Sequence, residues 1–234
     1  MPPDVTPRVL RTTSFAADAA DFVCERIREA ISARGFCRLA LSGGNTPRAV
    51  HAELVKRASQ VSWEHVQITF GDERCVPPED ADSNYRMARE TLLDPICIPT
   101  GNVFRIRGEI EPEEAARDYE AHLTAVATRL GEARYVHDLI LLGLGEDGHT
   151  ASLFPGSPAL SETKRNVIPA TGPKPPPQRV TMTFPLINAA RHVAFLAQGA
   201  AKLPLIEEII EGGSTLPAAA VRPVNGAVTW IVGV

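Results

Sequence analysis

The fold is decided by residues 139–149, which read Leu-Ile-Leu-Leu-Gly-Leu-Gly-Glu-Asp-Gly-His. The first four residues are apolar without alternation, as in a strand that is covered on both faces of a parallel sheet. Glycines and polar side chains follow at once, and they predict a loop at the carboxyl end of that strand. This transition indicates an α/β fold whose loop brings polar side chains to one edge of the sheet.

Strands and helices alternate along the rest of the chain. Two more apolar strands, at residues 36–41 and 65–70, end in similar loops, and further strands are expected at 180–184, 192–196 and 228–232. Helices are expected at 15–33, from Thr46-Pro47 onward, from Asp82 or Ser83 to Leu93, at 112–130 and at 203–210. Residues 171–178 contain four prolines and are expected to form a loop. The pattern predicts one domain over residues 1–234: an open, mainly parallel, twisted sheet of Rossmann-like α/β type with helices on both faces.

The composition argues against several classes of partner. The net charge of −4 leaves no basic excess to neutralise a nucleic acid backbone. No apolar run approaches the ~20 residues that a membrane-spanning helix needs, and residues 1–11 lack the apolar region of a signal peptide. The cysteines have no regular spacing, which is typical of reduced thiols (Cys24, Cys37, Cys75, Cys97). We therefore expect a cytoplasmic protein that binds neither nucleic acid nor membrane.

Three of the strands end in loops rich in glycine and polar residues, at 42–46, 71–74 and 143–152. In open α/β sheets, ligands bind outside the carboxyl ends of the strands. Loops that are far apart in sequence are therefore expected to converge on one site.

The loop at 42–46 reads Ser42-Gly43-Gly44-Asn45-Thr46 and lies between a strand and a helix. Glycines let a backbone approach an anion closely, and a helix N-terminus offers unpaired N–H groups. The stretch is not a Walker A loop, because the Gly-Lys-Ser/Thr ending is missing. The alternative is a plain glycine turn in which Thr46 caps the helix.

The loop at 71–74 reads Gly71-Asp72-Glu73-Arg74. Such a charged run most often forms a solvated surface turn. The buried strand just before it directs the charges toward the expected site, so a role in binding or catalysis is the second interpretation.

Asp147 and His149 lie two residues apart in the third loop. A histidine transfers protons near neutral pH, and a neighbouring carboxylate can orient its ring or stabilise its cation. The alternative is a structural or surface histidine. Neither Ser42 nor Ser152 lies in the GxSxG motif of serine hydrolases. The histidines are scattered without an HExxH motif, so no metal ligand or cofactor is expected.

Taken together, three motifs resemble the 6-phosphogluconolactonase family, which shares a structural superfamily with the glucosamine-6-phosphate deaminases. They are Leu-Ser-Gly-Gly-Asn-Thr-Pro (41–47), Phe-Gly-Asp-Glu-Arg (70–74) and Gly-Leu-Gly-Glu-Asp-Gly-His-Thr-Ala-Ser-Leu-Phe-Pro (143–155). Weaker matches are Pro-Pro-Gln-Arg-Val-Thr-Met-Thr (176–183) and Gly-Ala-Ala-Lys (199–202). Asn45 departs from the pattern, since serine is more usual there.

The resemblance implies the deaminase-like fold and hydrolysis of 6-phospho-D-glucono-1,5-lactone in the pentose phosphate pathway. It implies that His149 is the general base, that Asp147 supports it and that Asp72 lies close by. The loop at 42–46, with Arg179 and Lys202, would hold the 6-phosphate. Arg74 resembles an active-site arginine of the family and would contact the lactone or the phosphate. Charge-assisted bonds from arginine and lysine suit a phosphate dianion.

Two other functions remain as alternatives. An amino-sugar-phosphate deaminase or isomerase would typically continue after Asp-Gly-His toward an Asn-Glu-Pro, and would carry a tyrosine after its Asp-Glu. This chain has Thr150-Ala151-Ser152 and Arg74 at those places. A non-catalytic sugar-phosphate sensor would keep the phosphate site and could lose the acid–base pair. In each case the partner is a small sugar phosphate, bound by a monomer or a small homo-oligomer.

Overall fold

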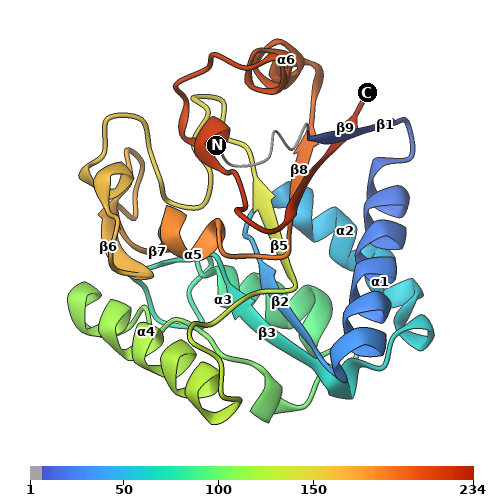
Figure 1. Cartoon of the computed structure of the whole chain (residues 1–234), viewed down its shortest axis with the longest axis vertical. Helices are drawn as coiled ribbons and strands as arrows, with labels where there is room; N and C mark the ends of the chain where they lie inside the picture. Colours follow the sequence, from blue (N-terminus) through green and yellow to red (C-terminus); the bar gives the residue numbers. More distant parts are fainter. Residues whose placement is uncertain (1–6) are drawn as a thin grey trace.

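The computed structural model describes residues 7–234 and is organised around a parallel sheet (Figure 1). Every pair of neighbouring strands in this sheet is parallel. Together with the helices around it, the sheet confirms the α/β class with a mainly parallel sheet. Its strands lie in the order β1 (Arg8–Thr12), β9 (Ala227–Gly233), β8 (His192–Gln198), β5 (Leu139–Gly143), β2 (Cys37–Leu41) and β3 (Val66–Phe70).

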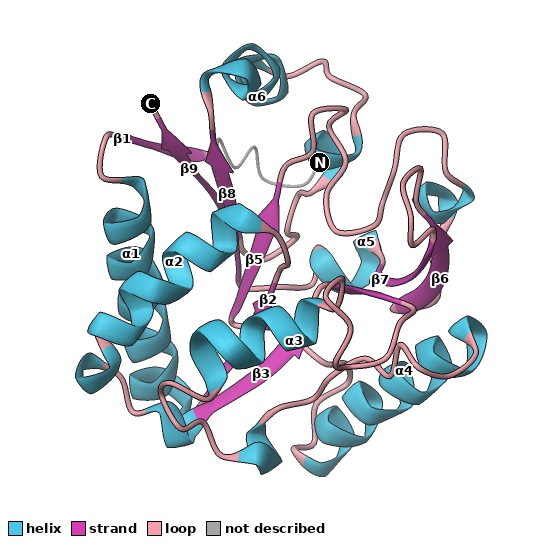
Figure 2. Cartoon of the chain, turned by 180° about the vertical axis from the view of Figure 1, so that it is seen from behind, coloured by secondary structure: helices cyan, strands magenta, loops and turns pink. Residues whose placement is uncertain are grey.

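The helices lie on both sides of this sheet. Helices α1 and α2 pack against each other, and Figure 2 shows α2 crossing in front of the strands. Helix α4 lies on the opposite side of the molecule from α1 (Figure 1). The helices are α1 (Phe15–Arg34), α2 (Asn45–Lys56), α3 (Asn84–Ala88), α4 (Pro112–Arg129), α5 (Phe184–Ile187) and α6 (Leu203–Glu211).

The apolar runs of the sequence form the centre of the sheet. All five residues of β2 are buried, and β3 pairs with it so that Leu39 lies beside Ile68 and Leu41 beside Phe70. Residues 139–142 are fully buried, as their unbroken apolar run predicts. Burying one such leucine contributes about 1.5–3 kcal/mol. This buried centre gives the loops at the strand ends a rigid base.

A second, antiparallel sheet corrects two sequence-based expectations. It consists of β4 (Asp72–Arg74), β7 (Gln178–Met182) and β6 (Val167–Thr171), in that order. The expected surface turn at 71–74 is therefore mostly a strand, because β7 pairs with it. The expected loop at 171–178 is shorter, because Thr171 and Gln178 pair across it. Short strands of polar residues depend on such partners, which are distant in sequence.

Three further differences concern the ends of elements. Strand β1 was not expected from the polar sequence around it, and it forms by pairing with β9. Ser83 caps α3 as one of the two expected residues, its hydroxyl accepting from the Arg86 N–H, but residues 89–93 continue as a π-helix. Helix α2 begins at Asn45 after Gly44, so Thr46 is not its cap.

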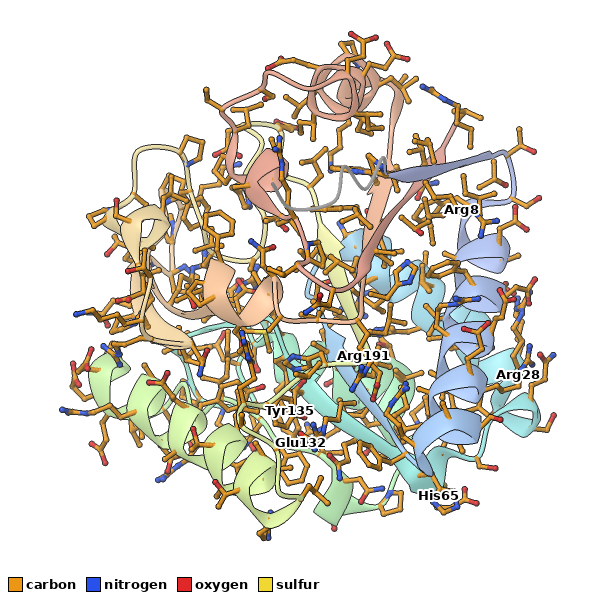
Figure 3. The ribbon with its side chains drawn as sticks, viewed as in Figure 1. Arg8, Arg28, His65, Glu132, Tyr135 and Arg191 are labelled. Atoms are coloured by element: carbon orange, nitrogen blue, oxygen red, sulfur yellow. The ribbon has the colours of Figure 1, made fainter. Side chains whose placement is uncertain are left out.

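A cluster of charged residues lies at the amino end of the parallel sheet. The Asp138 carboxylate accepts from the Arg38 N–H at 2.8 Å and pairs with Arg34 at 2.7 Å and Arg191 at 3.3 Å. Figure 3 shows Arg191 near Tyr135 and Glu132 in the lower middle of the view. The Arg38 guanidinium lies over the Tyr135 ring and pairs with Glu132 at 2.6 Å. The opposite, carboxyl edge carries the glycine-rich loops.

Candidate active site

A cavity of about 370 Å³ opens at the carboxyl edge of the sheet. The strand order reverses between the parallel neighbours β2 and β5, because within this sheet the chain continues from β2 to β3 on one side and from β5 to β8 on the other. Such a switch point is where open α/β sheets bind ligands. The lining residues are Ser42, Gly43, Gly44, Asn45, Thr46, Pro47, Asp72, Arg74, Asn84, Gly143, Leu144, Gly145, His149, Ala151, Leu196 and Lys202.

The residues expected at the site lie together, except that Asp147 and Arg179 do not line this cavity. Asp147 still reaches it through His149: its Oδ1 lies 2.5 Å from the ring Nδ1 and 3.1 Å from the backbone N of His149. Burial alone would raise the pKa of Asp147, but the hydrogen bonds from His149 outweigh it and lower that pKa. An ionised Asp147 holds the proton on Nδ1, which leaves Nε2 as the basic nitrogen.

The loop around this pair has no room for larger residues. A Cβ on Gly145 would lie 2.1 Å from Nδ1 of His149 and 2.7 Å from Oδ1 of Asp147. The Phe154 ring packs against the imidazole with 4.5 Å between the ring centroids. Ala151 has a φ of 47°, a left-handed conformation that is uncommon for a residue with a Cβ. The fold thus holds the imidazole from two sides.

The opposite wall is formed by the loop at 42–46 and the first turn of α2. Gly44 has a φ of 104°, a conformation that glycine adopts at little cost. Two cations also line the cavity. Lys202 donates from Nζ to the Leu144 carbonyl at 2.7 Å, and Arg74 donates from Nη1 to the Asp82 carbonyl at 2.5 Å. Within residues 7–234 neither side chain forms an ion pair, so both cations are available to an anion.

Asp72 lies between the two walls and is 8% exposed. Its Oδ2 accepts from the Ser152 hydroxyl at 2.6 Å, and its Oδ1 accepts from Nδ2 of Asn84 at 3.1 Å. The carboxylate is therefore fixed from both sides.

Arg179 lies directly opposite Arg74 in the ladder between β4 and β7. Burial, and then the positive charge of Arg74, lower the pKa of Arg179. The Nε atoms of both guanidiniums are buried without a hydrogen-bond partner within residues 7–234. Two adjacent like charges with unused donors are a suitable environment for an anion.

Asn84 and Ser152 contact Asp72 and were not singled out from the sequence. Asn84 is the first residue of α3, ten or more residues beyond the loop at 71–74, so no local pattern connects it to Asp72. Ser152 belongs to the motif at 143–155, but the sequence assigns it no contact. The signal that could have found it is its place in the same loop as His149, at the edge where β4 begins.

A second, larger cavity of about 770 Å³ adjoins the site at Asp147 and Phe154. Its walls are mainly proline and other small or apolar residues, and its charged lining residues are Glu111 and Asp147. Two carboxylates disfavour a phosphate, so the first cavity is the candidate site for an anionic substrate. Within residues 7–234, no three His, Cys, Asp or Glu side chains are grouped to hold a metal ion, and no helix is long and apolar enough to cross a membrane.

Comparisons with known proteins agree with this geometry. Residues 11–230 match the family described as glucosamine-6-phosphate isomerases/6-phosphogluconolactonase. A 6-phosphogluconolactonase of Rattus norvegicus is 40% identical over 93% of this chain and 86% of its own length, and one of Synechocystis is 41% identical over 90% and 87%. The solved 6-phosphogluconolactonase of Trypanosoma brucei superposes with a TM-score of 0.83 at 31% identity, covering 98% of this chain and 97% of its own. The chain therefore belongs to the glucosamine-6-phosphate isomerase/6-phosphogluconolactonase family.

Proposed function

We propose that this chain hydrolyses 6-phospho-D-glucono-1,5-lactone to 6-phospho-D-gluconate, a reaction of the pentose phosphate pathway. The observation that carries the proposal is the pair of His149 and Asp147 at a cavity that Lys202 and Arg74 also line. The relatives named above are 6-phosphogluconolactonases, and the similarity to this chain covers most of their length. The cavity thus combines a group suited to proton transfer with cations suited to a phosphate.

In this mechanism, Nε2 of His149 takes a proton from a water molecule as the water oxygen attacks the lactone carbonyl carbon. The tetrahedral intermediate collapses with cleavage of the bond between that carbon and the ring oxygen. The imidazolium returns the proton to the ring oxygen, which becomes the 5-hydroxyl of the product. Asp147 keeps the ring in the required tautomer and stabilises its transient charge.

The reaction needs little else, because a δ-lactone is an activated ester. A positioned base, an anchored phosphate and a donor for the developing oxyanion are sufficient. General base catalysis contributes about 10²–10⁴ in rate. No covalent nucleophile, metal or cofactor is required by this chemistry.

The phosphate is held, in this proposal, by the loop at 42–46, the first turn of α2 and Lys202, all of which line the cavity. Arg74 contributes a further positive charge to the cavity lining, and it contacts the phosphate or the lactone end. Arg179 lies beside Arg74 in the β4–β7 ladder and acts on the phosphate from there. Asp72 also lines the cavity and lies close to the sugar in this proposal.

The family also includes amino-sugar-phosphate isomerases, so membership alone leaves the reaction open. The loop after His149 continues with Thr150, Ala151 and Ser152 and supplies no further acid.

We infer a cytoplasmic location from the free thiols of all four cysteines. A monomer or a small homo-oligomer fits a cavity lined by one chain, and residues 1–234 are taken to act as one domain.

The test uses lactone made in situ from glucose 6-phosphate, at slightly acidic pH to slow spontaneous hydrolysis. We expect the purified protein to accelerate lactone decay and to leave glucosamine 6-phosphate unchanged. Release of ammonia from glucosamine 6-phosphate would instead identify a deaminase. Saturable binding of 6-phosphogluconate without acceleration of lactone decay would identify a sensor.

A further inference from the structure

Asn84 is a polar side chain in the cavity wall for which the mechanism above gives no role. It lines the cavity but is only 3% exposed. Its backbone N–H donates to Oε1 of Glu73 at 2.8 Å, and the other Glu73 oxygen accepts from the Ser83 hydroxyl and the Tyr85 N–H. The Glu73 carboxylate thereby holds the first turn of α3 in place. Asn84 is therefore a rigid part of the site.

The hydrogen bonds of Asn84 determine which way its amide points. Nδ2 donates to the Asp72 carbonyl at 3.0 Å and to Oδ1 of Asp72 at 3.1 Å. Both partners are acceptors, so only the nitrogen of the amide can face them. The amide oxygen must then point the other way, toward Gly43, where a Cβ would lie only 1.8 Å from it.

Within residues 7–234 the side-chain hydrogen bonds of Asn84 are made by Nδ2 alone, so its amide oxygen has no protein donor. Asn84 itself and Gly43, which this oxygen faces, both line the cavity. A fixed acceptor at the cavity wall can take a hydrogen bond from a ligand without any rearrangement of the protein. The neighbouring Asp72 carboxylate disfavours an anion at this point. The ligand group that fits is a neutral hydroxyl.

We propose that Asn84 contacts the substrate directly and determines specificity, its amide oxygen accepting a hydrogen bond from one ring hydroxyl of the sugar lactone. The proposal rests on the lactone hydrolysis proposed above. The phosphate and the lactone carbonyl have no proton to donate, whereas the hydroxyls at carbons 2, 3 and 4 do. Asn84 thus distinguishes a polyhydroxylated lactone from a simple phosphorylated ester.

The rival hypothesis is that Asn84 acts only by holding Asp72. Ser152 provides the matched control, because its hydroxyl donates to the other Asp72 oxygen at 2.6 Å and Ser152 does not line the cavity. A defect transmitted through Asp72 appears in both Asn84→Ala and Ser152→Ala. A defect in hydroxyl recognition appears only in Asn84→Ala.

The experiment measures kcat/KM of the wild type, Asn84→Ala and Ser152→Ala on the parent lactone and on its 2-, 3- and 4-deoxy analogues. We expect Asn84→Ala to lose about tenfold on the parent, as for one hydrogen bond. On one analogue the loss should shrink to about that of Ser152→Ala, because only the contact with Asp72 is then missing, while the loss of Ser152→Ala should be the same on all four.

An equal loss for Asn84→Ala on all four lactones would overturn the proposal. If Asn84→Ala does not fold, as judged by circular dichroism, Asn84→Ser replaces it, since its shorter side chain cannot reach the hydroxyl. Failure of the wild type to hydrolyse the parent lactone would count against the proposed function itself and is seen before any variant is compared.

Discussion

The imidazole of His149 is bound to Asp147 through a single carboxylate oxygen, which lies 2.5 Å from Nδ1 and 3.1 Å from the backbone N of the same histidine. The same oxygen thus fixes the ring and the backbone that carries it. Gly145 makes this arrangement possible, because a side chain there would occupy the space of the imidazole. In the proposed mechanism, this leaves Nε2 as the base that activates water.

Replacement of Asp147 by asparagine should lower kcat by about 10² at neutral pH, because an amide no longer selects the tautomer with the proton on Nδ1. The KM should change less than about threefold, since Asp147 does not line the cavity. Steady-state kinetics on the lactone measure both. Glu146→Gln is the matched control, an exposed neighbouring acid whose loss should leave kcat unchanged. Equal kcat in both variants would refute the role of Asp147.

Removal of the Lys202 ammonium should raise the KM for the phosphorylated lactone about tenfold, because one charge-assisted contact is lost. Lys202→Ala should have no such effect on the dephosphorylated lactone. Arg179→Ala should likewise weaken binding of the phosphorylated lactone and leave binding of the dephosphorylated lactone unchanged. Lys164→Ala, at an exposed lysine, controls for the change in net charge. Equal losses on both substrates would contradict the assignment of these cations to the phosphate.

Substitution of Gly43 by alanine should reduce kcat/KM at least about tenfold. The added Cβ would lie 1.8 Å from the Asn84 amide oxygen and would displace that side chain from Asp72. Gly101→Ala is the matched control, because nothing lies within 4 Å of a Cβ built there. Kinetics and circular dichroism of both variants test this, and a fully active Gly43→Ala would show that Asn84 has room to move.

Acid should destabilise the fold between about pH 6.5 and pH 4. Burial lowers the pKa of His51 and that of His192 from 6.5 to about 4, and the pKa of His137 to about 3, helped in each case by nearby arginines. In this window the unfolded chain binds a proton at each of these three histidines that the folded chain does not bind, so stability falls as the pH falls. The slope should approach about 4.1 kcal/mol per pH unit. Urea unfolding at pH 7, 6 and 5 measures it, and a stability independent of pH would contradict the burial of neutral histidines.

The sequence was sufficient for the parallel sheet and for most of the cavity. Unbroken apolar runs such as residues 139–142 are typical of strands buried on both faces, and parallel strands bring their carboxyl ends to one edge. The loops at 42–46 and 143–152 could therefore be placed together from the sequence alone.

The antiparallel sheet and the contacts of Asp72 could not be predicted from the sequence. Strand β4 is short and polar, and it exists because β7 pairs with it from about a hundred residues away. Asn84 reaches Asp72 only because Glu73 fixes the start of α3. The position of Arg179 also could not be predicted from the sequence. Its motif indicates a phosphate contact, but in the structure it pairs with Arg74 in the β4–β7 ladder and does not line the cavity.

The most direct test of the account compares His149→Ala with His65→Ala, an exposed histidine at the amino end of β3 (Figure 3). Lactone decay gives kcat, and calorimetry gives the affinity for 6-phosphogluconate. We predict that His149→Ala lowers kcat by about 10²–10⁴ and changes the affinity less than about threefold, while His65→Ala changes neither. A His149→Ala variant that keeps the wild-type kcat would contradict the assignment of His149 as the general base.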